Sequence, residues 1–170
     1  MSFVLIRYVT MEDWEAICQI EAENFSQQEA SPPEDLQKRI EYLRDTFLVA
    51  EIDGNIAGYI VGPAVCQRYL SDDLFHEVRK NAEQGGFIVL TSLSIAKAFQ
   101  GQGVGTALLA ALKDLAVSQN RQGISLTCHD YLITYYEANG FCDEGESESR
   151  HGGAFWYNLV WENPYLDKKL

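Results

Sequence analysis

Three glycines stand at alternate positions in the stretch QGQGVGTALLAAL, which runs from Gln100 to Leu112. A glycine-rich backbone can approach a ligand closely, and the first amides of a following helix are available to bind an anion. The sequence therefore predicts a phosphate-binding segment. Its members are Gln100, Gly101, Gln102, Gly103, Val104, Gly105 and Thr106.

Three other interpretations of this segment are possible. A P-loop requires a second glycine at the position of Thr106, followed by lysine, so it is excluded. The dinucleotide fingerprint also requires glycine there, and four residues (AKAF) separate the expected strand from the loop. With Asp130 as a ribose partner, this second motif stays a weaker alternative. The third is a tight turn that binds nothing.

A second motif, YYEANGF (Tyr135 to Phe141), follows about 30 residues after the glycines. The two motifs in this order resemble the GNAT family of acetyltransferases. The resemblance implies acetyl-CoA as the cofactor, with its pyrophosphate on the amides from Gly101 to Thr106. It also implies that Leu93, Ser94 and Ile95 contact the pantetheine arm, and that Tyr136 contacts acetyl-CoA beside its sulfur atom.

The longer stretch CHDYLITYYEANGF is most similar to the arylalkylamine branch of that family, which includes the serotonin N-acetyltransferases. This resemblance implies an N-acetyltransferase that moves acetyl from the thioester to a primary amine by direct attack in a ternary complex. The acceptor is expected to be an arylalkylamine, another small cationic amine or a peptide amine. The alternative is a non-catalytic acyl-CoA-binding sensor with the same fold.

The reaction needs an acid for the departing thiolate and a base for the amine. The resemblance assigns the acid to Tyr136. Serotonin N-acetyltransferases of vertebrates carry two histidines where this sequence has Val89 and Thr91, so that base is absent. The segment FSQQEASP is similar to the glutamate-bearing segment of insect dopamine N-acetyltransferases, which implies Glu29 as the base. His129 or a chain of water molecules is the alternative.

Cys128 raises the possibility of an acetyl-cysteine intermediate. A thiol in an apolar strand is usually inert, and no sequence feature lowers its pKa, so direct attack is favoured. The three histidines, His76, His129 and His151, are too dispersed to indicate a zinc site. We therefore expect no metal.

Composition limits the partners of the chain. Its 170 residues include 13 basic and 25 acidic ones, a formal charge of −12 that disfavours nucleic acid and anionic membranes. No CxxC pair, secretory signal or membrane-length apolar run is present, so a cytoplasmic protein is expected. The length suits a single N-acetyltransferase domain over residues 1–170. A homodimer is left open.

The pattern of apolar and turn-forming residues alternates strands with helices, which predicts an α/β protein. The family resemblance implies a mixed, largely antiparallel central sheet of about six or seven strands flanked by helices. Strands are expected at 3–9, 47–52, 56–65, 87–95, 124–129 and 154–162. Helices are expected at 14–25, 34–45, 106–120 and 131–139, and a polar loop at 143–153.

Overall fold

The computed structural model describes residues 3–166, which pack as two compact units. The first unit consists of residues 3–62 together with Ser92–Leu112, and the second of Pro63–Thr91 together with 113–166. Helix α4 (Val104–Ser118) contributes residues to both. The single domain expected over residues 1–170 stays a prediction, and its first two and last four residues lie outside the described range.

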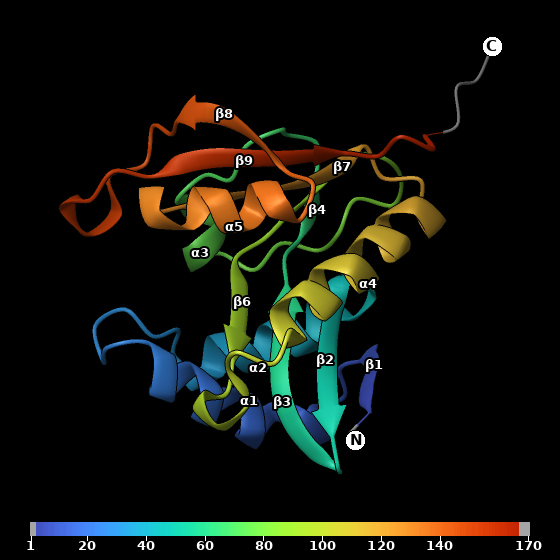
Figure 1. Ribbon diagram of the computed structural model, residues 1–170, viewed down its shortest axis with the longest axis vertical. Helices are drawn as coiled ribbons and strands as arrows, with labels where there is room; N and C mark the ends of the chain where they lie inside the picture. The colour runs from blue at the N-terminus through green and yellow to red at the C-terminus, as the bar shows by residue number, and fades with distance from the viewer. Residues whose placement is uncertain (1–2, 167–170) are drawn as a thin grey trace. The chain divides into compact units, whose positions relative to one another are not determined.

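The first unit contains a four-stranded sheet in the order β1-β2-β3-β6, in which neighbouring strands are antiparallel. Asp53 and Gly54 adopt φ angles of 50° and 80° in the β2–β3 turn, and positive φ angles at both central residues are what a two-residue Asp-Gly hairpin turn requires. Helices α1 and α2 lie together on one side of the sheet (Figure 1). The bounds are Val4–Tyr8 (β1), Trp14–Asn24 (α1), Pro33–Tyr42 (α2), Phe47–Ile52 (β2), Asn55–Val61 (β3) and Ser92–Ile95 (β6).

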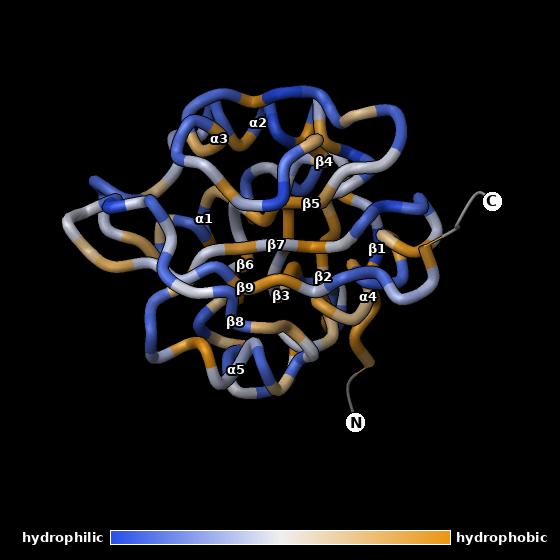
Figure 2. The backbone as a smooth tube through the Cα atoms, turned by 90° about the horizontal axis from the view of Figure 1, so that it is seen from above, coloured by the Kyte–Doolittle hydropathy of each residue, from blue (hydrophilic) through white to orange (hydrophobic). Residues whose placement is uncertain are grey.

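The second unit contains a five-stranded sheet in the order β4-β5-β7-β9-β8. Strands β5 and β7 run parallel, and the other neighbouring pairs are antiparallel. Figure 2 shows β5 and β7 mainly in the colours of hydrophobic residues, as expected for strands inside a sheet. The bounds are Ala64–Val65 (β4), Asp73–His76 (α3), Phe87–Val89 (β5), Gly123–Cys128 (β7), Ile133–Ala138 (α5), Cys142–Glu146 (β8) and Tyr157–Glu162 (β9).

One antiparallel and one mixed sheet, both flanked by helices, confirm the predicted α/β class, although the strands form sheets of four and five. The strand expected at 87–95 is in fact two strands, β5 and β6, which belong to different sheets. The amide of Leu90 still bonds to the carbonyl of Ser125 at 2.8 Å, so the pairing of β5 with β7 continues one residue beyond β5. The apolar pattern runs on through Leu90 and Thr91, so it gives no sign of the change of partner.

Strand β8 was missed because it lies mainly in the segment expected to be a polar loop. All five of its residues are exposed. Its pairing with β9 shifts register in the segment from Asp143 to Glu146. Its pairing depends on backbone groups, so a polar, glycine-containing composition does not exclude it.

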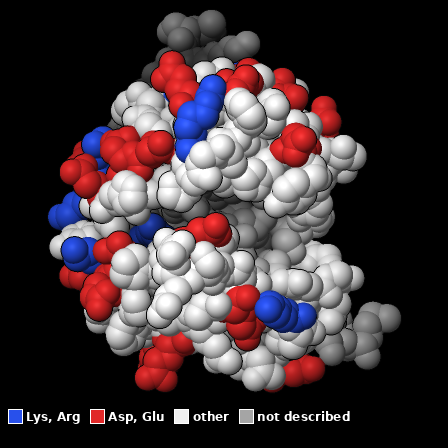
Figure 3. Space-filling model, turned by 90° about the vertical axis from the view of Figure 1, so that its left-hand side faces the viewer, with Lys and Arg blue, Asp and Glu red and all other residues white. Residues whose placement is uncertain are grey.

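Acidic side chains are spread over the face shown in Figure 3, with a few basic side chains among them. This distribution agrees with the excess of acidic residues in the composition. Among residues 3–166, no helix is both long and apolar enough to cross a membrane.

Candidate functional site

The glycine loop, defined as Gln100–Thr106, connects β6 to α4 through a short 3-10 helix at Lys97–Phe99. Gly101 and Gly103 have φ angles of 77° and 81°, which L residues rarely adopt. A Cβ atom at either position would meet nothing within 4 Å, so glycine is needed for its backbone conformation and not for lack of space. Gly105 differs, because it already belongs to α4.

Helix α4 therefore begins two residues earlier than the sequence indicated. The amide of Ala107 bonds to the carbonyl of Gly103 at 3.0 Å, which starts the ladder of the helix. The amides of Val104 and Gly105 precede that bond and have no acceptor within the helix. Together with the positive end of the helix dipole, they can hold an anionic group such as a phosphate.

Strand β6 is an edge strand of the four-stranded sheet and pairs only with β3 there. Hydrogen-bonded and non-bonded pairs alternate along antiparallel strands. Ala96 N bonds to Ala57 O at 2.8 Å, so the backbone groups of Ser94 face β3 and those of Leu93 and Ile95 face away. Of the three residues predicted for the pantetheine arm, Leu93 and Ile95 thus direct backbone groups to the edge of the sheet.

Asn24, the last residue of α1, reaches this edge. Its Nδ2 donates to Ser94 Oγ at 2.6 Å and to the carbonyl of Ile95 at 2.8 Å. Gln100 Nε2 donates to Asn24 Oδ1 at 3.2 Å and to the same carbonyl at 3.1 Å. Within the first unit, the end of α1, the edge of β6 and the start of the glycine loop are therefore joined by side-chain amides.

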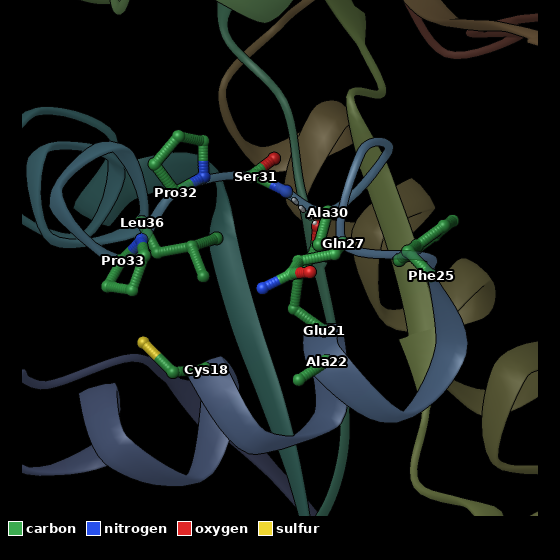
Figure 4. A pocket seen from close by; sticks show the side chains of 10 residues that line it. All are labelled: Cys18, Glu21, Ala22, Phe25, Gln27, Ala30, Ser31, Pro32, Pro33 and Leu36. Atoms are coloured by element: carbon green, nitrogen blue, oxygen red, sulfur yellow. Dashed lines mark hydrogen bonds between the residues drawn. The ribbon is translucent and has the colours of Figure 1, made fainter.

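Glu29, the predicted base, lies in the α1–α2 loop, defined as residues 25–32. The residue is exposed, and its amide donates to the carbonyl of Ser26 at 3.0 Å. It does not line the cavity of about 400 Å³ in this part of the first unit. The carboxylate that lines this cavity is Glu21, from α1 (Figure 4).

Glu21 is only 3% exposed, and both of its carboxylate oxygens accept hydrogen bonds. Tyr59 donates its hydroxyl to Oε1 at 2.5 Å, and the amide of Ser31 donates to Oε2 at 2.8 Å. Arg39 is 2% exposed, and its Nη1 donates to Ser31 Oγ at 3.1 Å. Burial lowers the pKa of Arg39, and the nearby charge of Glu21 opposes this effect.

Neither Glu21 nor Asn24 is among the site residues predicted above, although the sequence carries a signal for them. Ile17, Ile20, Glu21 and Asn24 have the spacing of one helix face, and Ile17 and Ile20 are buried. A glutamate within the apolar stripe of a helix indicates a paired or functional carboxylate. Among the aromatic residues of this region, Phe25 lines the cavity, whereas Tyr59 is fully buried.

In the second unit, Tyr136 lies on α5 and is largely buried against the rings of Tyr135 and Phe141, at centroid distances of 5.1 and 5.8 Å. Burial raises the pKa of its hydroxyl, and Cys128 and Tyr135 add to the effect. The hydroxyl is therefore protonated at neutral pH and able to donate.

Two neighbouring residues in this unit bear on the alternatives. Burial, with help from Asp143 and Asp130, raises the pKa of Cys128 to about 12, which keeps the thiol protonated and poorly nucleophilic. The ring of His129 stacks on Trp156 at 4.1 Å and on Tyr131 at 5.4 Å. These ring contacts hold the imidazole in place, and His129 as the alternative base stays a prediction.

The first unit thus offers backbone amides and carboxylates, and the second offers the largely buried hydroxyl of Tyr136. In the described part of the chain, no group of three or more His, Cys, Asp and Glu side chains could hold a metal ion.

Comparison with known proteins identifies the family. The model of the acetyltransferase (GNAT) family matches residues 14–141, which include both units' motifs. The chain belongs to the GNAT family. Members of this family are acyl-CoA-dependent acyltransferases, and the amides of the glycine loop suit the phosphates of CoA. No curated protein matches the chain.

Solved structures similar to this GNAT protein include three proteins of low sequence identity. Ard1 from Thermoplasma volcanium has a TM-score of 0.70 and 21% identity, covering 94% of this chain and 97% of that one. The ribosomal-protein-S18-alanine N-acetyltransferase from Escherichia coli gives 0.72 and 16%, covering 99% of both. N-acetylglutamate synthase from Neisseria gonorrhoeae, solved with coenzyme A and N-acetyl-glutamate, gives 0.71 and 20%, covering 99% of this chain and 36% of that one. At these identities the likeness shows the fold alone.

Proposed function

We propose that this GNAT protein is an acetyl-CoA-dependent N-acetyltransferase that acetylates a primary amine by direct attack in a ternary complex. The observation that carries the proposal is the glycine loop, which follows the open edge of β6 and leads into the amino terminus of α4. Amides of Val104 and Gly105 would bind the pyrophosphate, and backbone groups of Leu93 and Ile95 would bind the pantetheine arm.

Tyr136 is our candidate for the acid that protonates the departing thiolate. Its raised pKa supports this role in one respect, because the hydroxyl carries its proton throughout the neutral range. The same property argues against a role as base at neutral pH. The raised pKa of Cys128 favours direct attack over an acetyl-cysteine intermediate.

Glu29 is proposed as the base, or as the residue that attracts the amine. Its exposure on the α1–α2 loop leaves the carboxylate open to a substrate. The acidic composition favours small cationic amines, including arylalkylamines, and basic peptide ends over anionic acceptors. An amine with a pKa of about 10.4 is only ~0.1% neutral at pH 7, so a carboxylate that accepts its proton would assist attack.

The test is release of free CoA thiol from acetyl-CoA in the presence of arylalkylamines, polyamines, amino acids and peptides. We expect turnover with at least one cationic primary amine and none with its N-acetylated product. Binding of acetyl-CoA without turnover on any acceptor would instead support the sensor function. A burst of stable acetyl-enzyme would overturn direct attack.

A further inference from the structure

The last turn of α1 holds both ends of the α1–α2 loop. At the near end, the amide of Phe25 donates to the carbonyl of Glu21 at 3.1 Å, and Asn24 directly precedes the loop. At the far end, the amide of Ser31 donates to the carboxylate of Glu21 at 2.8 Å. Glu21 and Asn24 are three residues apart and so lie on one helix face. A shift of this turn would therefore move the loop as a whole.

The same turn is fixed to the segments proposed to bind CoA. Asn24 contacts Ser94, which is 3% exposed, and the carbonyl of Ile95. Its Oδ1 accepts from Gln100, the residue directly before Gly101. One residue further back, Glu23 Oε2 accepts from the amide of Lys97 at 3.1 Å. The side chain of Asn24 thus links the two parts of the proposed site that lie in the first unit, since it contacts both β6 and Gln100.

We propose that Asn24 is a positioning residue that couples CoA binding at the glycine loop to the order of the α1–α2 loop. This inference rests on the proposed function, because it takes the glycine loop as the CoA site. Residues Gln100–Gly103 are exposed, and a bound pyrophosphate would restrict them. Gln100 then holds Asn24 more firmly, and Asn24 holds the turn that carries the α1–α2 loop.

The coupling is reciprocal by thermodynamic linkage. If CoA binding orders the α1–α2 loop, an acceptor that needs the ordered loop binds more tightly once CoA is present.

The experiment is hydrogen exchange of residues 25–32 with and without saturating CoA, which requires no knowledge of the acceptor. One hydrogen bond is worth roughly a three- to tenfold change in an equilibrium constant, so we expect CoA to slow exchange in this loop by about threefold or more. Asn24→Ala should lose this slowing and bind CoA about three- to tenfold more weakly. Asn24→Asp keeps an acceptor for Gln100 but cannot donate to Ile95, so it should retain part of the slowing.

Gln19→Ala is the matched control, because Gln19 is an exposed amide on the same helix. It should behave as the wild type. Once an acceptor amine is known, Asn24→Ala should raise its KM more than it lowers kcat. Equal slowing of exchange in Asn24→Ala, or no slowing in a wild-type protein that binds CoA, would overturn the inference. Failure of the wild type to bind CoA would contradict the proposed function itself. If Asn24→Ala does not fold, Asn24→Asp decides: slowing of exchange equal to that in the wild type would overturn the inference, and reduced slowing would support it.

Discussion

The hydroxyl of Tyr59 donates a 2.5 Å hydrogen bond to Oε1 of Glu21, deep in the first unit. Tyr59 is fully buried in the sheet, and Glu21 lies on the helix that covers it. Burial, together with the charge and the hydrogen bond of Glu21, raises the pKa of Tyr59 well above its usual value. The carboxylate also balances the charge of the buried Arg39. This polar pair therefore joins the sheet to the helices and to the α1–α2 loop.

The pair predicts an order of stabilities. Glu21→Gln removes the charge that compensates Arg39 and should lower the free energy of unfolding by about 3 kcal/mol. Tyr59→Phe removes one donor and should cost about 1–2 kcal/mol. Urea unfolding at pH 7 measures both, with the exposed Glu15→Gln on the same helix as a control expected within about 0.5 kcal/mol of the wild type. If Tyr59→Phe lowered the free energy of unfolding more than Glu21→Gln did, compensation of the Arg39 charge by Glu21 would be shown to be unimportant.

The glycine loop offers a matched pair of substitutions. Gly103 and Gly54 have φ angles of 81° and 80°, and a Cβ atom would meet nothing within 4 Å at either position. Alanine should therefore strain both backbones equally, by about 1–2 kcal/mol. Only Gly103→Ala should also weaken CoA binding, by about tenfold, because a strain of this size opposes the loop conformation that presents the amides. Calorimetric titration of both variants with CoA tests this, and equal affinities would remove Gly103 from the site.

Much of the fold could be predicted because local signals coincide with the elements that hold the site. The turn at Asp53 and Gly54 and the glycines at 101 and 103 each determine backbone geometry over a few residues. The division of residues 87–95 between two sheets could not be predicted in this way. It depends on which strand lies alongside, and alternation within a single strand carries no information about that.

In the candidate site, too, local features could be predicted from the sequence and contacts between distant residues could not. Motif spacing indicates the loop and Tyr136, since both lie in continuous segments of sequence. The hydrogen bond from Asn24 to Ser94 joins residues 70 positions apart, so it could not be predicted from the spacing of residues in the sequence. Glu21 could have been suspected from its position in an apolar helix stripe, but its partner Tyr59 could not.

The ion pair of Arg7 with Asp13 predicts how stability depends on pH. Burial alone would raise the pKa of Asp13, but hydrogen bonds from Arg7 at 2.8 and 2.9 Å and from Thr10 outweigh it and hold the pKa below its usual value. A lowered pKa contributes stability above the unfolded pKa of about 3.9 that is lost as pH falls through the folded value. The wild type should thus exceed Asp13→Asn in stability at pH 7, and the difference should shrink below about pH 4. Urea unfolding across this range measures it; a constant difference would contradict the prediction.

Tyr136→Phe tests the proposed acid. The variant retains the ring that packs on Phe141 but loses the hydroxyl, so CoA should still bind. We expect turnover with a productive amine to fall at least about tenfold, the lower range for loss of a general acid. Tyr135→Phe is the control on the same helix and should keep most of the activity. Equal turnover in wild type and Tyr136→Phe would remove the assignment.

Glu29→Gln tests the proposed base, and its outcome depends on what the exposed carboxylate does. If Glu29 is the base, its removal should lower kcat by about a hundredfold and abolish the acidic limb of the pH profile. A carboxylate that only attracts a cationic amine should raise KM while kcat is retained, and the effect should weaken with salt. The control is Glu34→Gln, an exposed carboxylate at the start of α2. If rate, KM and pH profile were all unchanged, the proton would have to leave through water or His129, and His129→Phe, which preserves stacking on Trp156, would separate these two routes.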